Sequence, residues 1–118
     1  VDWVGTDFYS KYPVWDDLQR FYDGVQWKRK PVAITEWSMQ EKDEPQFVKR
    51  LISWVVTHKR VQMLTYYQGF GVGNTYEANL YPRNVNMIRK KIRRANFLPY
   101  TEYQAGLLPP LPPKEKKR

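Results

Sequence analysis

The sequence predicts an α/β protein made of three consecutive βα units with parallel strands. Three apolar or β-branched stretches, at residues 1–9, 31–37 and 61–67, are each followed by a segment whose apolar residues recur at three-to-four spacing. Repeated βα units require parallel strands joined by right-handed crossovers. We therefore expect the carboxyl ends of the three strands to meet at one edge of the sheet.

The first unit opens with residues 1–9, in which large apolar residues alternate with small or polar ones and which ends in Tyr9. Residues 14–27 then predict an amphipathic helix. Its first turn carries Asp16 and Asp17, where the helix dipole favours negative charge. The apolar positions of this helix are Trp15, Leu18, Phe21, Tyr22 and Val25.

The second unit centres on residues 31–37 (PVAITEW), which predict a short buried strand with a carboxylate, Glu36, at its carboxyl end. Folds of the α/β class place their chemistry at that end of the strands. A single glutamate there is more commonly an ordinary solvated residue, and the convergence of the other strand ends is what favours a functional role. The next helix runs from about residue 45 to about residue 58, after the start signal Asp43-Glu44-Pro45.

The third unit consists of residues 61–67, a glycine-containing loop and a last helix that starts at residues 81–82 and ends near residue 95. The outward face of this helix is basic, and a solvated surface is the ordinary role of such a face. Residues 101–118 are rich in proline and lysine and predict a disordered tail, with a proline-rich ligand for a partner domain as the alternative. The residues expected to converge at the strand ends are Tyr9, Glu36, Trp37, Tyr66, Tyr67 and Gln68.

Composition excludes several classes of site. The chain has no cysteine and a single histidine, so thiolate metal sites, disulfides and histidine-rich metal clusters are ruled out, and we expect no metal or cofactor. No apolar stretch is long enough to span a membrane. The net charge of +8 is concentrated in the last helix and the tail. Because the chain opens with Val1 in a strand-like segment, we expect it to be a piece of a longer protein.

Three stretches resemble the sixth, seventh and eighth strands of the (β/α)8 glycoside hydrolases, above all the mannanase-like family 26 group and its bacterial relatives. They are VDWVGTDFY at residues 1–9, KPVAITEW at residues 30–37 and MLTYYQG at residues 63–69. Residues 79–83 and 97–100, around the last helix, are also similar to those relatives. The resemblance covers roughly residues 1–100 and implies a partial TIM barrel, with residues 101–118 as a separate tail.

The resemblance also implies roles for individual residues. Glu36 would be the catalytic nucleophile, and Tyr9 would donate a hydrogen bond to it. Tyr66 or Tyr67 would stack under a sugar ring, where family mannanases usually carry a tryptophan. The remaining residues expected to contact a polysaccharide or oligosaccharide substrate are Trp37, Gln68 and Asp7. A retaining glycosidase also needs a second carboxyl about 5 Å away, and the family places that acid/base on the fourth strand, which this chain lacks.

Three parallel strands cannot close a barrel. The missing half would be supplied in cis or by another chain, or the chain would be a truncated form without activity. We expect part of a retaining glycoside hydrolase that cleaves β-linked polysaccharide, in an extracellular setting as the family resemblance favours. The alternative is a non-catalytic carbohydrate-binding or assembly remnant. A nucleic-acid-binding module that uses the basic last helix ranks third, because the aromatic residues cluster with Glu36 away from the basic ones.

Overall fold

The computed structural model describes residues 2–69 and 75–95, and it has strands and helices in alternation. The tail predicted for residues 101–118 lies outside the described residues. None of the described helices is long and apolar enough to cross a membrane. The elements are β1 (Val4–Tyr9), α1 (Trp15–Tyr22), η1 (Val25–Trp27), β2 (Val32–Ser38), α2 (Pro45–Thr57), β3 (Val61–Tyr66), η2 (Ala78–Leu80) and α3 (Pro82–Ala95).

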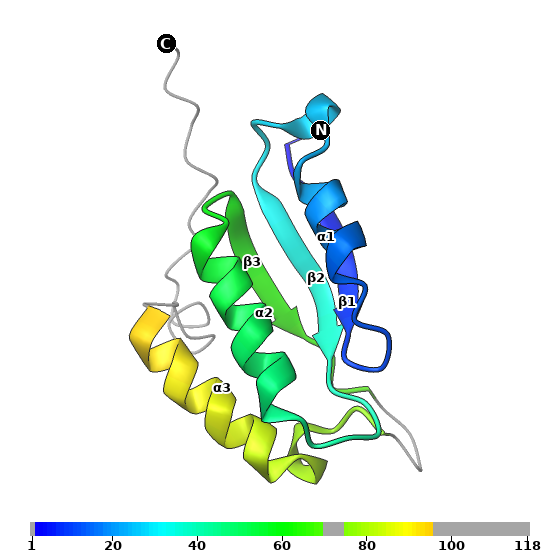
Figure 1. Ribbon diagram of the computed structural model, residues 1–118, viewed down its shortest axis with the longest axis vertical. Coiled ribbons are helices and arrows are strands. Elements are labelled where there is room, and N and C mark those ends of the chain that lie inside the picture. The colour runs from blue at the N-terminus through cyan, green and yellow to red at the C-terminus, as the bar shows by residue number, and fades with distance from the viewer. Residues whose placement is uncertain (1, 70–74, 96–118) are drawn as a thin grey trace.

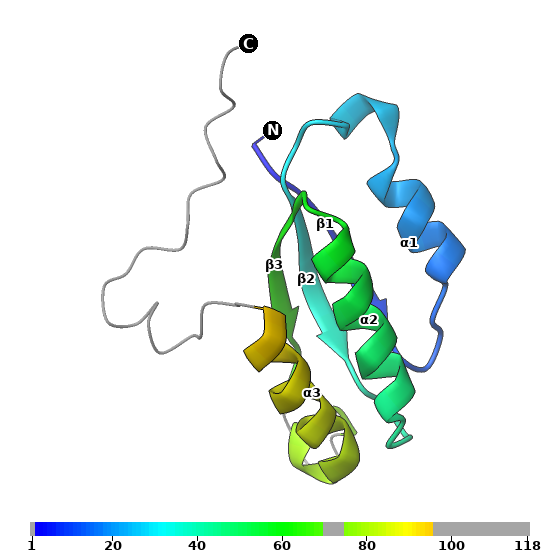
Figure 2. The same ribbon diagram turned by 60° about the vertical axis from the view of Figure 1, so that its left-hand side comes forward.

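The three strands form one sheet in the order β1-β2-β3, and both pairings are parallel. The predicted α/β class with three parallel strands is therefore confirmed. All three carboxyl ends lie at one edge of the sheet (Figure 1). The helices α1, α2 and α3 cover one face of the sheet (Figure 2), and no described element covers the other, which we call the open face.

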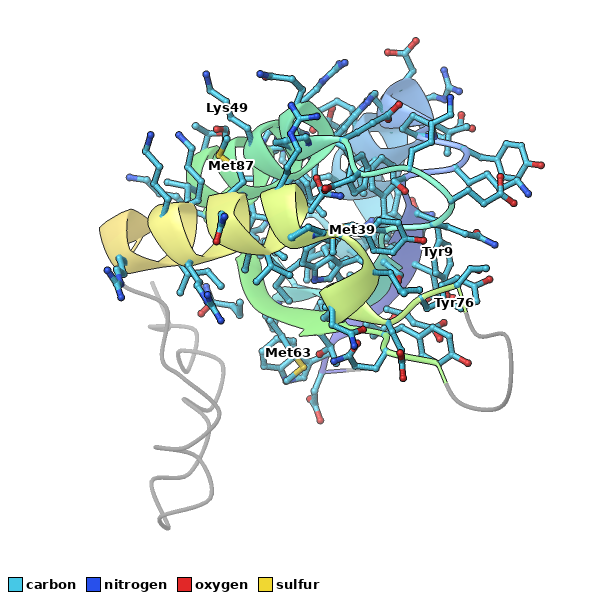
Figure 3. The ribbon with its side chains drawn as sticks, turned by 90° about the horizontal axis from the view of Figure 1, so that it is seen from below. Tyr9, Met39, Lys49, Met63, Tyr76 and Met87 are labelled. Atoms are coloured by element: carbon cyan, nitrogen blue, oxygen red, sulfur yellow. The ribbon has the colours of Figure 1, made fainter. Side chains whose placement is uncertain are left out.

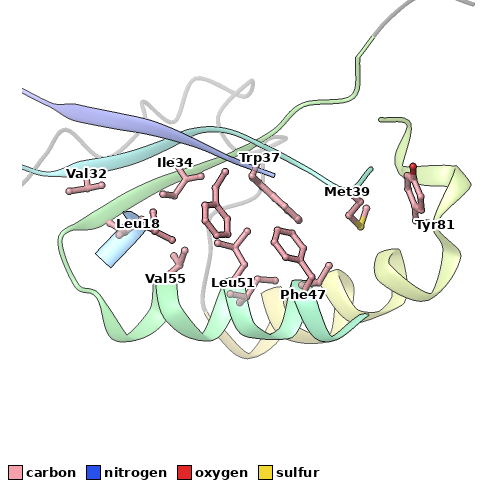
Figure 4. Packing of buried hydrophobic residues seen from close by; sticks show 13 residues of the cluster. Leu18, Val32, Ile34, Trp37, Met39, Phe47, Leu51, Val55 and Tyr81 are labelled. Atoms are coloured by element: carbon pink, nitrogen blue, oxygen red, sulfur yellow. The ribbon is translucent and has the colours of Figure 1, made fainter. Parts of the chain in front are cut away.

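The hydrophobic core lies between β2 and α2. Val32 and Ile34 of β2 and Leu51 of α2 have no exposed surface, and Leu18 of α1 and Phe47 of α2 complete the layer (Figure 4). Burying an aliphatic side chain of this size contributes about 1.5–3 kcal/mol to folding. The central strand β2 is therefore held in place by apolar contacts along the helix-covered face.

Gln19 joins α1 to the carboxyl end of α2. Its amide nitrogen donates to Asp23 at 3.0 Å, and its amide oxygen accepts from the Trp54 indole N–H at 2.9 Å, so the orientation of the amide is fixed. His58 Nε2, 2.8 Å from the same oxygen, must then donate to it. Nδ1 of His58 lies 2.6 Å from the Trp54 carbonyl oxygen. The amide of Gln19 thus contacts the side chains of Asp23, Trp54 and His58.

The loop between β2 and α2 is fixed to the start of α3. The sequence assigns Asp43 to the start of α2, but α2 begins at Pro45 without a side-chain cap. The Asp43 carboxylate instead accepts from the backbone N–H groups of Arg83 at 3.0 Å and Asn84 at 2.8 Å, and so caps the first turn of α3. This cap crosses from one βα unit to the next and holds the segment that follows Glu36.

Replacing Gln19 with alanine should lower the free energy of unfolding by about 1–2 kcal/mol, because the Trp54 and His58 donors lose their shared acceptor in a half-buried place. Urea denaturation followed by circular dichroism measures the change. Gln46→Ala, at an exposed position of α2, is the matched control and should change the midpoint little. Equal stabilities for the two variants would contradict the role given to Gln19.

Candidate functional site

An irregularity in the register of the sheet sets the direction of Glu36. Thr6 of β1 lies opposite Ile34 of β2, but the next residue, Asp7, lies opposite Glu36, so Thr35 is an extra residue in β2. Side chains alternate between the two faces of a strand, and one extra residue shifts that alternation. Glu36 therefore shares the open face with Asp7.

The same bulge turns Trp37 into the core. Its register partner is Phe8, and both side chains are only 3% exposed. Both rings pack on Phe47 of α2, with centroid distances of 5.9 Å for Phe8 and 6.4 Å for Trp37. Under strict alternation from Ile34 onward, Glu36 would face the helices and Trp37 the open face. The bulge exchanges the two.

The phenol of Tyr9, at the end of β1, lies beside the Glu36 side chain and interacts with it. Burial raises the pKa of Tyr9, and the interaction with Glu36 and the negative charges of Glu36 and Asp7 raise it further. The phenol therefore stays protonated well into the alkaline range and remains a donor. A phenol that keeps its proton beside a carboxylate can donate a charge-assisted hydrogen bond to it.

Asp7 is the second carboxylate on the open face. It is the register partner of Glu36 in the neighbouring strand, and its Oδ1 accepts a hydrogen bond from the Thr35 hydroxyl at 2.9 Å. The bulged residue Thr35 thus orients one carboxylate while it redirects the other. Two carboxylates and a phenol donor on one surface can support nucleophilic or general-base chemistry at Glu36.

Tyr76 is a member of this site that the sequence reasoning missed. Its ring contacts Tyr9 edge-on with the centroids 6.0 Å apart, and it contacts Tyr67 with the centroids 5.1 Å apart. Figure 3, which looks onto the carboxyl edge of the strands, shows Tyr9 and Tyr76 on the same side of the molecule. Tyr76 follows the glycine-containing loop, and no periodicity in the sequence indicates where that loop returns. The three rings form what we call the tyrosine cluster, Tyr9, Tyr67 and Tyr76.

The other predicted site residues lie elsewhere. Trp37 is in the core, and Tyr66 packs on it edge-on at 4.9 Å while donating its hydroxyl hydrogen to the Tyr76 carbonyl at 2.6 Å. Gln68 accepts the backbone N–H of Ala78 at 2.8 Å. Tyr66 and Gln68 thus fix the segment that carries Tyr76. The structure brings together Tyr9, Glu36, Asp7 and Tyr67 from the predicted set.

The site is an open surface. Neither of two shallow hollows on the described part of the chain is lined by Glu36 or Tyr9. The nearer one, of about 260 Å³, lies between the loops that follow β1 and β2. No group of three or more His, Asp or Glu side chains within residues 2–69 and 75–95 could hold a metal ion. Met63, 42% exposed on β3, points away from α2 and α3 and marks how open this face is (Figure 3).

Comparison of the chain with protein-family models and with curated protein sequences finds no match. The resemblance to glycoside hydrolases therefore stands on the quoted residues alone. A function for this site is therefore inferred from the residues around Glu36.

The pKa of Tyr9 gives a test of the site. An isolated tyrosine titrates near pH 10. The folded protein raises this pKa. Protonated Tyr9 therefore contributes fully to the free energy of unfolding below about pH 10, and this contribution is lost as the pH rises further. We expect the unfolding free energy of Tyr9→Phe to fall less steeply than that of the unchanged protein above pH 10.

Ultraviolet titration of the phenols and urea unfolding between pH 9 and pH 12 measure both effects. Glu36→Gln should move one of the nine tyrosines to an earlier titration, because the neighbouring negative charge is removed. Glu77→Gln, at an exposed position, is the control. Identical titration curves for Glu36→Gln and Glu77→Gln would show that Glu36 does not act on Tyr9.

Proposed function

We propose that the chain supplies the nucleophile of a retaining glycoside hydrolase that cleaves β-linked polysaccharide, in the manner of the endo-β-mannanases that it resembles. Glu36 attacks the anomeric carbon, and Tyr9 donates a hydrogen bond to the Glu36 carboxylate. The tyrosine cluster offers aromatic faces on which the C–H faces of sugars can pack.

The single observation that carries this proposal is that the Tyr9 phenol and the Glu36 carboxylate lie close enough to interact at the carboxyl edge of parallel strands. A nucleophilic carboxylate must be ionised and correctly aimed. The Thr35 bulge supplies the direction, and the phenol, whose own pKa is raised, supplies a lasting donor. The resemblance assigns the same two roles to the same two residues.

The partner of this chain is then the missing half of the barrel, which is supplied in cis or by another chain. Parallel sheets are characteristically covered on both faces, and unpaired strand edges need protection. Here β1 and β3 each pair only with β2 among the described strands, and the open face carries the proposed nucleophile. The missing half would cover that face and bring the acid/base carboxyl to about 5 Å from Glu36.

Covalent trapping tests the nucleophile. A 2-deoxy-2-fluoro-β-mannosyl fluoride reacts by attack of a Glu36 oxygen on the anomeric carbon while fluoride leaves with the bonding electron pair. Fluoride needs no protonation, so the acid/base residue is not required. We expect mass spectrometry of the peptide that contains Glu36 to show the mass of one fluoroglycosyl group.

The matched variants are Glu36→Gln, which should not be labelled, and Tyr9→Phe, which should be labelled about tenfold more slowly because one hydrogen bond to the carboxylate is lost. Asp7→Asn keeps the nucleophile and should still be labelled at Glu36. Labelling at Asp7, or an unlabelled Glu36 in the protein completed with its barrel half, would refute the assignment.

A second candidate is carbohydrate binding without turnover, which the tyrosine cluster favours. Mutual edge contacts at 5.1 and 6.0 Å hold the Tyr76 ring between Tyr67 and Tyr9, as a rigid aromatic platform requires. Binding alone needs no second carboxyl.

Tyr76→Ala should weaken binding of a β-mannan oligosaccharide by about tenfold, because stacking on an aromatic ring is lost. Isothermal titration calorimetry measures the affinity. Tyr12→Ala, at a ring that is 70% exposed and outside the cluster, is the control and should bind normally. Equal affinities for both variants would remove the tyrosine cluster from the binding site.

A further inference from the structure

The outer wall formed by α2 and α3 carries positive charge only. The two helices pack against each other, and their sequences, PQFVKRLISWVVT and PRNVNMIRKKIRRA, contain no acidic residue. They hold two basic residues on α2 and six on α3, out of the 20 in the chain. Lys49 of α2 lies on the same side of the molecule as Met87 of α3 (Figure 3). The exposed members with described side chains and no ring contact form what we call the cationic wall, Lys49, Arg83, Arg89, Lys90 and Arg93.

Among the described residues, no ion pair joins a residue of this wall to a carboxylate. The ion pairs found there join Lys11 to Glu41, Arg20 to Asp17 and Lys42 to Glu44, all outside the wall. Of the basic residues on the two helices, Arg50 is engaged by the ring of Trp15, with its guanidinium carbon 4.3 Å from the ring centroid. Like charges close together on a helix repel, and an anionic partner relieves that repulsion.

The wall begins beside the candidate site. Asp43, in the loop that follows β2, caps the first turn of α3, where Arg83 lies. The Tyr81 hydroxyl, one residue before α3, accepts the backbone N–H of Glu41 at 2.7 Å. The segment from Tyr76 to Arg83 therefore leads directly from the tyrosine cluster to the wall. A linear polymer that occupies the carboxyl edge can continue along α3.

We propose that the cationic wall binds an acidic polysaccharide, a glycan that carries carboxylate or sulfate groups at regular intervals. This inference rests on the proposed function in naming a glycan, and it narrows the substrate class to chains with negative charge. Arginine presents a planar fork of donors that matches carboxylate and sulfate oxygens, and three of the five wall residues are arginines.

The surface chemistry favours a glycan over nucleic acid or a membrane. α3 has no aromatic residue, and the two on α2 are engaged, Phe47 in the core and Trp54 with Gln19 and His58. The wall therefore lacks the aromatic platforms on which single-stranded bases stack. It also lacks the exposed apolar stripe that anchors an interfacial helix in lipid, because Ile88 and Ile92 pack against the core.

Binding of the full 118-residue chain to polygalacturonate, measured by affinity electrophoresis at several salt concentrations, tests the proposal. Neutral galactomannan and single-stranded DNA are run beside it. The variant Arg89→Gln/Lys90→Gln/Arg93→Gln keeps helix-forming residues and lowers the net charge by three. The control Lys28→Gln/Arg29→Gln/Lys59→Gln makes the same charge change at exposed positions off the wall. Circular dichroism checks that both variants fold.

We expect the unchanged protein to bind polygalacturonate more tightly than DNA and to lose affinity steeply with salt. The wall variant should bind at least tenfold more weakly, and the control variant should lose less than twofold. Equal losses in the two variants would mean that net charge alone acts and would overturn the proposal, and so would tighter binding to DNA. Covalent trapping reports on Glu36 alone, and binding to polygalacturonate reports on the wall residues, so failure of the proposed function and failure of the cationic wall give different results.

Discussion

The bulge at Thr35 is the constraint on which the site depends. One extra residue in β2 places Glu36 on the open face and Trp37 in the core. Trp37 then packs on Phe47, so the apolar burial that stabilises β2 also holds the bulge in place. Removing the bulge would bury a carboxylate among apolar side chains, which costs several kcal/mol unless the charge is paired. The packing of Trp37 in the core and the direction of the Glu36 side chain therefore depend on the same bulge.

A second interaction gives the site its electrostatic character. Asp7 lies beside Glu36 on the open face, and two neighbouring carboxylates repel each other. Thr35 donates to Asp7, and the Tyr9 phenol lies beside Glu36, so each carboxylate has a hydroxyl group next to it. The two negative charges in turn keep the proton on Tyr9. The phenol therefore stays protonated and can act as a hydrogen-bond donor toward Glu36.

Hydrophobic periodicity predicts the order of strands and helices here because every unit has a one-sided apolar pattern. It also predicts that Tyr9 and Glu36 meet, since parallel strands share one carboxyl edge. Periodicity does not reveal a bulge, so the place of Trp37 in the core, and of Tyr66 against it, depends on a register that only the folded sheet defines. Tyr76 and the Asp43 cap on α3 are contacts between different βα units, and such contacts leave no trace in local sequence.

The two faces of the sheet carry different types of residue. The helix-covered face holds the apolar core, and the outer surface of α2 and α3 beyond it is cationic. The open face holds small and polar side chains such as Ala33 and Thr35 next to Asp7 and Glu36. A half-buried phenol and two carboxylates lie together on this face. Their arrangement is that of a surface against which a ligand and further strands can be placed.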